Sequence, residues 1–362
     1  MSRCAVLATR NTEFFADRVF DARSVRQMRA SLQPMAAPWL AARALAEQRG
    51  LRLLTADRLD GLDARDLQLV AYDWTLQAQA LARRGASPSV LVSFEPPVIA
   101  WWLYANLPRI SRLFRHVFLF EGARRRVAPG AAFHRLCFPL TCPTTPPSSQ
   151  PWSTRRFLVM VNSNKALPKI THLARWFDRP REVSLKRALA SLRYPPIAAD
   201  RYLERWRAID FFAARPDFDL FGEGFRERRH PAVSPRLHAR ALQAYRGQPA
   251  DKLALMGGYK FALAIENTRF PGYVSEKLFD CLFAGSIPVY AGAPDVGRYV
   301  PPQAFIDLSR FASYAELERF LRDLSARDAD DYLAAGQDFL RSPAFEPFRA
   351  DTFARELVDA LE

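Results

Sequence analysis

A proline-rich segment, CPTTPPSSQPWS at residues 142–153, limits what this chain can fold into. Its four prolines and small polar residues cannot continue a helix or lie in a central strand, because proline lacks an amide hydrogen and fixes φ. A chain of 362 residues is long enough for two domains. The segment therefore predicts an inter-domain linker at 146–154. It would join a domain at 1–145 to a second at 155–340, followed by a C-terminal segment at 341–362.

Short apolar runs alternate with segments of helical period on both sides of this linker. Strands are predicted at 4–8, 51–55, 67–72, 90–94 and 117–120 before it, and at 157–161, 218–221, 261–265, 287–290 and 305–307 after it. Helices are predicted at 23–32, 39–47, 202–213, 275–283 and 314–324. The alternation predicts an α/β fold in which each half has a parallel sheet covered on both faces. Such sheets bind ligands outside the carboxyl ends of their strands.

The chain is strongly basic. Lys plus Arg number 52 and Asp plus Glu 38, which gives a formal net charge of +14, and only six of the cations are lysines. This excess favours an anionic partner such as a phosphate, a nucleic acid or a lipid surface. An Arg-rich composition inherited from a GC-rich genome explains it equally well. A nucleic-acid-binding protein would interleave arginines with aromatic residues, and the sequence has no such run.

Other features indicate a reducing compartment. Four cysteines at positions 4, 137, 142 and 281 show no CxxC pair or zinc spacing, so free thiols are expected. The sequence shows no secretory leader pattern and no apolar window long enough to cross a bilayer. A cytoplasmic location is therefore expected. Peripheral contact with the inner, anionic face of the cytoplasmic membrane is a further hypothesis.

The densest group of polar residues lies in YKFALAIENTRFPGYVSEKLFDCLFAGSIPVYAG, at 259–292. A predicted strand ends just before Glu266, and after a loop Ser275, Glu276 and Lys277 open an amphipathic helix. The amides and dipole of a helix N-terminus favour an anion, to which Lys277 would add a positive charge. Glu276 could accept hydrogen bonds from ribose hydroxyls. The pattern predicts a nucleoside diphosphate site. The alternative is that Ser275 and Glu276 merely cap the helix and Lys277 is solvated.

This segment resembles the donor-binding motif of the family 10 glycosyltransferases, the α-1,3/4-fucosyltransferases, of bacterial type. The matching positions are Tyr259, Lys260, Phe261, Glu266, Asn267, Tyr273, Val274, Glu276, Lys277, Gly285, Pro288, Val289 and Gly292. The resemblance implies that Asn267 and Tyr273 line a GDP-sugar site, in which Glu276 holds the ribose and Lys277 the pyrophosphate. It also implies two Rossmann-like domains facing a cleft, the GT-B arrangement, with the last helix packing back on the first domain.

The resemblance places two further groups in the donor site. The run FLVMVNSNK resembles the family's strand ending in Ser-Asn, which assigns Ser163 and Asn164. An arginine on the next helix contacts the diphosphate in the family, and a guanidinium can hold two oxygens at once. In RYLERWRAIDFF the candidates are Arg205, then Arg207 as a close alternative, then Arg201. Compared with the family, an insertion separates Asn164 from Arg205.

The first domain offers a candidate catalytic base in SVLVSFEPPVIAWW. Glu95 follows the predicted strand at 90–94, and Pro96 and Pro97 fix the turn after it. The segment resembles the family's F-E-S-P motif, whose glutamate is regarded as the base, with Pro96 in place of Ser. Apolar neighbours such as Trp101 would raise the pKa of Glu95 toward neutrality, as a base requires. The alternative is a solvated glutamate at a strand end.

The resemblance predicts an inverting α-1,3-fucosyltransferase that moves L-fucose from GDP-β-L-fucose to a glycan hydroxyl. The expected acceptor is of N-acetylglucosamine type, on lipopolysaccharide or another surface or lipid-linked glycan. The alternatives are transfer of another GDP-sugar, such as GDP-arabinose, and a basic nucleic-acid-binding protein. No metal or other cofactor is expected to be essential, because Lys277, an arginine and helix amides can neutralise the leaving diphosphate. The DxD letters at 217–219 fall on a predicted strand.

Overall fold

The computed structural model describes residues 3–28, 32–59, 61–143, 150–164, 181–230 and 232–362. The chain divides into two compact units: Met1–Cys142 with Glu346–Glu362, and Pro143–Phe345. Residues 146–149 of the predicted linker and most of the insertion after Asn164, at 165–180, lie outside the described residues. Each unit is built on a parallel sheet, which confirms the predicted α/β fold class. No described helix is both long and apolar enough to cross a membrane.

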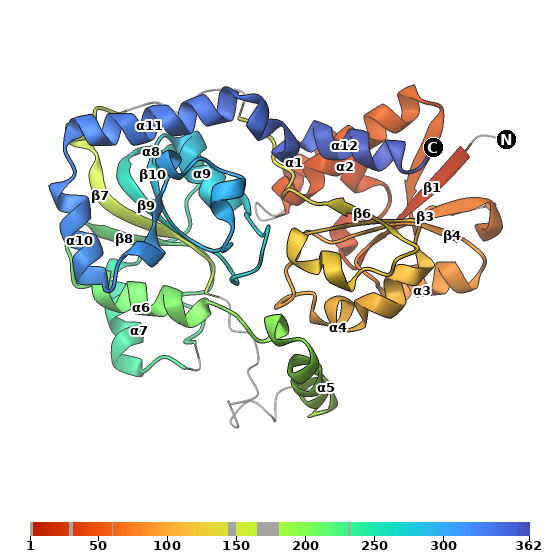
Figure 1. Cartoon of the computed structure of the whole chain (residues 1–362), viewed down its shortest axis with the longest axis horizontal. Helices are drawn as coiled ribbons and strands as arrows, with labels where there is room; N and C mark the ends of the chain where they lie inside the picture. Colours follow the sequence, from red (N-terminus) through yellow and green to blue (C-terminus); the bar gives the residue numbers. More distant parts are fainter. Residues whose placement is uncertain (1–2, 29–31, 60, 144–149, 165–180, 231) are drawn as a thin grey trace. The chain divides into compact units, whose positions relative to one another are not determined.

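The sheet of the first unit has the strand order β2-β1-β3-β4-β5-β6, with parallel pairing throughout. Its strands are β1 (Arg3–Ala8), β2 (Leu51–Thr55), β3 (Leu67–Tyr72), β4 (Ser87–Val92), β5 (His116–Leu119) and β6 (Ala132–Arg135). Its helices are α1 (Ala22–Gln27), α2 (Gln33–Gln48), α3 (Leu76–Arg83), α4 (Trp101–Ile110) and α12 (Ala350–Asp359). Helices α2 and α12 pack together on one face, and α3 and α4 lie on the other (Figure 1).

The sheet of the second unit has the strand order β11-β10-β9-β7-β8, again parallel. Its strands are β7 (Arg156–Val161), β8 (Phe218–Phe221), β9 (Tyr259–Ile265), β10 (Ile287–Ala291) and β11 (Ile306–Asp307). Its helices are α5 (Arg181–Arg193), α6 (Tyr202–Phe212), α7 (Pro235–Ala244), α8 (Lys252–Gly257), α9 (Glu276–Ala284), α10 (Tyr314–Asp323) and α11 (Ala326–Arg341). Helices α8, α9 and α11 lie on one face, and α6 and α7 on the other (Figure 1).

The two sheets share the order of their first five strands, and the first sheet adds β6 at its edge. In each unit the first strand lies between the second and the third, so the chain reverses its direction of winding there. The reversal falls between β1 and β3 in the first unit, and between β7 and β9 in the second. The helices that follow such neighbouring strands cover opposite faces, which opens a crevice at the carboxyl ends where ligands bind. The fold therefore points to the residues directly after β7 and β9, and directly after β1 and β3.

Candidate functional site

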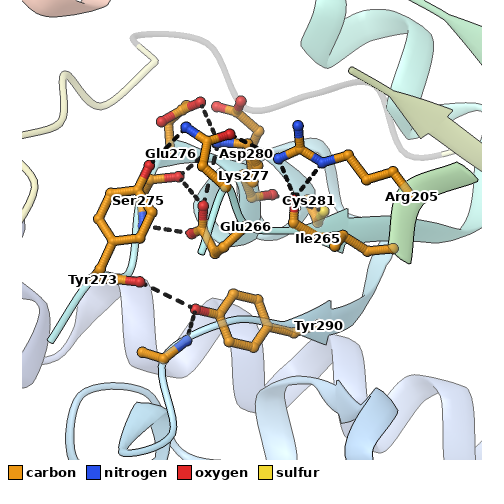
Figure 2. A network of polar contacts seen from close by, with 12 residues as sticks. Arg205, Ile265, Glu266, Tyr273, Ser275, Glu276, Lys277, Asp280, Cys281 and Tyr290 are labelled. Atoms are coloured by element: carbon orange, nitrogen blue, oxygen red, sulfur yellow. Dashed lines mark hydrogen bonds and ion pairs between the residues drawn. The ribbon is translucent and has the colours of Figure 1, made fainter. Parts of the chain in front are cut away.

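A buried carboxylate organises the carboxyl end of β9. Glu266 directly follows the strand and is fully buried. Its carboxylate accepts hydrogen bonds from the amide and the hydroxyl of Ser275, both at 2.7 Å, and lies 3.3 Å from the ammonium of Lys277 (Figure 2). Ser275 is the N-cap residue of α9, but its hydroxyl caps no helix amide. Glu266 thus joins the start of α9 to the end of β9.

Lys277 is held inside this network rather than solvated. Its side chain is 13% exposed, and its ammonium donates to the Ser275 hydroxyl at 3.0 Å and to the Glu276 carboxylate at 3.1 Å. Burial lowers the pKa of a lysine, but the charges of Glu266 and Glu276 outweigh this effect and raise the pKa of Lys277. Burial likewise raises the pKa of a glutamate, yet Lys277 and Lys252 hold the pKa of Glu276 at about 2. Both groups are therefore charged at neutral pH.

Arg205 reaches the same strand end from α6. It is buried, in the apolar stripe that includes Trp206 and Ile209. Its guanidinium donates to the carbonyl of Ile265 at 2.7 and 3.1 Å and to the side-chain oxygen of Asn267 at 2.8 Å. Asn267 in turn donates to the hydroxyl of Tyr273 at 3.1 Å. Burial lowers the pKa of Arg205. The predicted residues Arg205, Asn267, Tyr273, Glu276 and Lys277 thus meet around one strand end.

The side chains of the two alternative arginines have other partners, although the Arg201 amide donates to the Asn267 carbonyl at 2.9 Å. Arg207 is exposed and lines a surface pocket with Asp210 and Arg215. Arg201 precedes α6 and forms an ion pair with Glu204 at 2.9 Å. Arg205 is therefore the one of the three candidates whose side chain contacts Asn267.

Ser163 and Asn164 follow β7 and line a small cavity that Arg205 also lines. The side-chain nitrogen of Asn164 donates to the carbonyls of Gly224 at 3.0 Å and Arg228 at 2.7 Å, so it fixes the loop after β8. The side-chain oxygen of Asn164 is buried without a hydrogen-bond partner. The cavity places Ser163 and Asn164 beside Arg205, at the reversal point of the second sheet.

The DxD letters belong to a structural site. Asp219 lies within β8 and is fully buried. Its carboxylate pairs with Arg156 at 2.7 Å and Arg246 at 2.9 Å, and accepts a hydrogen bond from the Tyr259 hydroxyl at 2.6 Å. These contacts hold β8 to its neighbours.

Glu95 belongs to the first unit. Strand β4 ends at Val92, two residues earlier than predicted, and a short turn carries the chain from there to Glu95. In that turn the Glu95 amide donates to the Ser93 hydroxyl at 3.3 Å, and the Glu95 carbonyl accepts from the Tyr104 hydroxyl at 3.2 Å. The backbone of Glu95 is thus fixed just beyond the carboxyl end of β4, next to β3.

The sequence predicts no role for Glu266, although this residue belongs to the site. The signal was its position directly after an apolar strand, in the motif that carries Asn267. A carboxylate there is buried only if the following loop folds back onto it, as it does through Ser275. That folding depends on tertiary structure.

Comparison with known proteins supports the resemblance. Residues 210–334 match the model for glycosyltransferase family 10 (fucosyltransferase), C-terminal part. An α-(1,4)-fucosyltransferase of Arabidopsis thaliana is 51% identical over 69 residues, 19% of this chain and 17% of that protein. The α-(1,3)-fucosyltransferase FucT of Helicobacter pylori is 35% identical over 74 residues, 20% of this chain and 16% of that protein. These matches thus span less than a quarter of either relative's length.

Solved structures share the fold over almost the whole chain. An α1,3-fucosyltransferase crystallised with GDP is 13% identical and aligns with 99% of this chain and 89% of its own, at a TM-score of 0.52. Anabaena Alr3699/HepE, crystallised with UDP and glucose, is 12% identical and aligns with 99% of both chains, at a TM-score of 0.55. The fold is therefore of the GT-B type. The matched residues, 210–334, lie within the second unit, which therefore resembles the C-terminal part of the family 10 glycosyltransferases, the fucosyltransferases.

Proposed function

We propose that this chain is an inverting fucosyltransferase that uses GDP-β-L-fucose. The observation that carries the proposal is the network of Arg205, Glu276 and Lys277, because it lies at the reversal point of the second sheet. Glu276 and Lys277 also fall within the segment that matches the family domain. Two cations and a helix N-terminus at the carboxyl ends of parallel strands suit a diphosphate.

Binding of the diphosphate would require an exchange of partners. The network holds three cations, Arg205, Lys252 and Lys277, against the three carboxylates of Glu266, Glu276 and Asp280. Lys277 must release one carboxylate before it can contact a phosphate oxygen. Glu276 is the partner to be released, since its side chain is 30% exposed whereas that of Glu266 is fully buried. The freed Glu276 carboxylate could then accept hydrogen bonds from the ribose hydroxyls.

The transfer step needs a base on the acceptor side. In the proposed reaction the Glu95 carboxylate takes the proton of an acceptor hydroxyl while that oxygen attacks C1 of fucose. The bond from C1 to the β-phosphate oxygen breaks, and GDP leaves with the bonding electrons. Attack opposite the leaving group inverts the configuration at C1. Arg205, Lys277 and the amides at the start of α9 stabilise the charge on GDP, so the proposed reaction needs no metal.

The acceptor class is proposed from the relatives. The matched proteins include α-(1,3)- and α-(1,4)-fucosyltransferases, which favours a glycan hydroxyl, of N-acetylglucosamine type or on a lipid-linked glycan. A Xenopus laevis protein named GDP-fucose protein O-fucosyltransferase 3 is 39% identical over 75 residues, 20% of this chain and 16% of that protein. This match makes a protein hydroxyl the second candidate acceptor. We propose that the enzyme works on the cytoplasmic side of the membrane.

The test is transfer from GDP-fucose to N-acetyllactosamine by the full chain, with EDTA present. Wild type should transfer, and Glu95→Gln should lose at least a hundredfold in rate while still binding GDP. Glu47→Gln, an exposed carboxylate on α2 of the same unit, is the matched control and should retain activity. An active Glu95→Gln would exclude Glu95 as the base. If wild type neither transfers fucose from GDP-fucose nor hydrolyses it, but uses GDP-arabinose, that result would replace GDP-fucose by GDP-arabinose as the proposed donor.

A further inference from the structure

The first unit has its own reversal point, and Asp73 lies there. Asp73 directly follows β3, whose neighbours are β1 on one side and β4 on the other. Its amide donates to the carbonyl of Val92, the last residue of β4, at 2.9 Å. Arg10 follows β1, and Glu95 follows β4. Asp73 therefore lies between the β1/β3 crevice and the candidate base.

The side chain of Asp73 has capacity for a ligand. Its Oδ2 lies 3.7 Å from the guanidinium of Arg10, and its Oδ1 is buried without a hydrogen-bond partner. Leaving a buried acceptor unpaired costs about 1–3 kcal/mol. The adjacent helix α3 does not need Asp73, because the Thr75 hydroxyl caps it by accepting from the Ala78 amide at 3.1 Å. The fold thus places the carboxylate with Arg10 beside Oδ2 and no hydrogen-bond partner on Oδ1.

The backbone of Asp73 is also held in an uncommon conformation. Its φ is +63°, in the left-handed region that few residues other than glycine adopt. Holding a residue in that region costs of order 1 kcal/mol, and such residues concentrate at ligand sites. Here the conformation turns the chain from the end of β3 toward the N-terminus of α3.

Two groups link Asp73 to Glu95. The Tyr72 hydroxyl is buried, and its pKa is raised first by burial and then by the charges of Asp73 and Glu95. Burial raises the pKa of Asp73, while Arg10 and a hydrogen bond from Ser93 act in the opposite direction. The Ser93 hydroxyl also accepts the Glu95 amide at 3.3 Å. The backbones of Asp73 and Glu95 are therefore tied to adjoining residues at the end of β4, Val92 and Ser93.

We infer that Asp73 is a binding residue for the acceptor, whose carboxylate accepts hydrogen bonds from hydroxyl groups of a sugar. Arg10 beside it supplies donors, and a polyhydroxylated ligand uses an acceptor and a donor side by side. In this arrangement Asp73 holds one hydroxyl of the sugar while Glu95 faces the hydroxyl that reacts. The inference rests on the proposed function, in which Glu95 of the first unit takes the proton of the acceptor hydroxyl.

The test measures sugar binding by the full chain with saturation-transfer NMR. The probes are N-acetylglucosamine, N-acetyllactosamine, lactose and galactose at millimolar concentration. The variants are Asp73→Asn, which keeps the shape, and Asp73→Gly, which removes the carboxylate and suits φ of +63°. Asp66→Asn, an exposed aspartate of the same unit, is the control. GDP affinity and thermal unfolding are measured for each protein.

Wild type and Asp66→Asn should bind at least one probe, and both Asp73 variants should bind it at least tenfold more weakly. Their GDP affinity should be unchanged, and Asp73→Gly should be as stable as wild type. The inference is wrong if Asp73→Asn binds sugar like wild type, if wild type binds none of the four probes, or if both Asp73 variants unfold. Failure of the donor site would appear separately, as loss of GDP binding by wild type.

Discussion

At the scale of single residues, Arg205 and Arg207 form a natural comparison on one helix. Arg205→Lys should weaken GDP binding at least tenfold, about 1.4 kcal/mol. A lysine cannot hold both the Ile265 carbonyl and Asn267 while presenting a planar fork to phosphate. Arg207→Lys, at an exposed position, should bind GDP like wild type. Calorimetric titration checks both, and a loss confined to Arg207→Lys would reassign the diphosphate ligand.

A second residue-scale prediction concerns acid stability and Glu276. Its pKa in the folded chain, about 2, lies below its usual 4.5, so ionised Glu276 stabilises the fold above pH 4.5. This contribution is lost as the pH falls toward 2. Between pH 6 and pH 3 wild type should lose up to about 2 kcal/mol more of its free energy of unfolding than Glu276→Gln. Urea denaturation at both values measures this, and parallel losses in the two proteins would contradict the coupling of Glu276 to Lys277.

At the scale of elements, Gly222 controls how the end of β8 meets the end of β7. Its φ is +128°, and a Cβ there would lie 1.9 Å from the carbonyl oxygen of Asn162. Gly222→Ala should therefore cost roughly 2–4 kcal/mol of stability, because the backbone beside Ser163 must move. Gly247, with φ of +99° and open space around it, is the matched control, and its Ala variant should cost about 1 kcal/mol. Equal losses in urea denaturation would show that the contact with Asn162 does not matter.

Most elements that position the site could be predicted from sequence. Strand β9 contains the apolar run 261–265 that was predicted and begins two residues earlier, at Tyr259. The apolar spacing of α9 is clear, so each of its ends lies within one residue of the predicted 275–283. Strand β6 has no clear sequence pattern because AFHR is short and half polar, and its place in the sheet comes from pairing with β5. Helix α4 is hard to predict because proline usually breaks a helix, whereas Pro108 lies inside the last turn of this one.

The site itself could be predicted only where motif and local structure coincide. The spacing of Glu276 and Lys277 places both at a helix start, and the structure has them there. The roles of Glu266 and Asp73 depend on contacts between residues or strands that sequence does not bring together. Glu266 binds Ser275 nine residues on, and Asp73 contacts Val92 at the end of β4 because β3 pairs with β4. Neither contact has a local signal.

At the scale of the whole molecule, the two units share the order of their first five strands but carry different polar residues at their reversal points. The β7/β9 reversal gathers cations for a diphosphate, and the β1/β3 reversal places Asp73 near Glu95. The net charge of +14 adds a general attraction for anions. That attraction alone would not distinguish the donor site from any other basic surface. The decisive property is therefore specific recognition of the diphosphate.

The most direct test is a calorimetric titration of the full chain with GDP, with guanosine as the comparison ligand and EDTA present. The proposed donor site predicts saturable binding of one GDP per chain, with guanosine bound at least a hundredfold more weakly, about 2.7 kcal/mol. Lys277→Met should remove most of that difference. Equal binding of GDP and guanosine, or no binding of GDP, would contradict the assignment of Arg205 and Lys277 to the diphosphate.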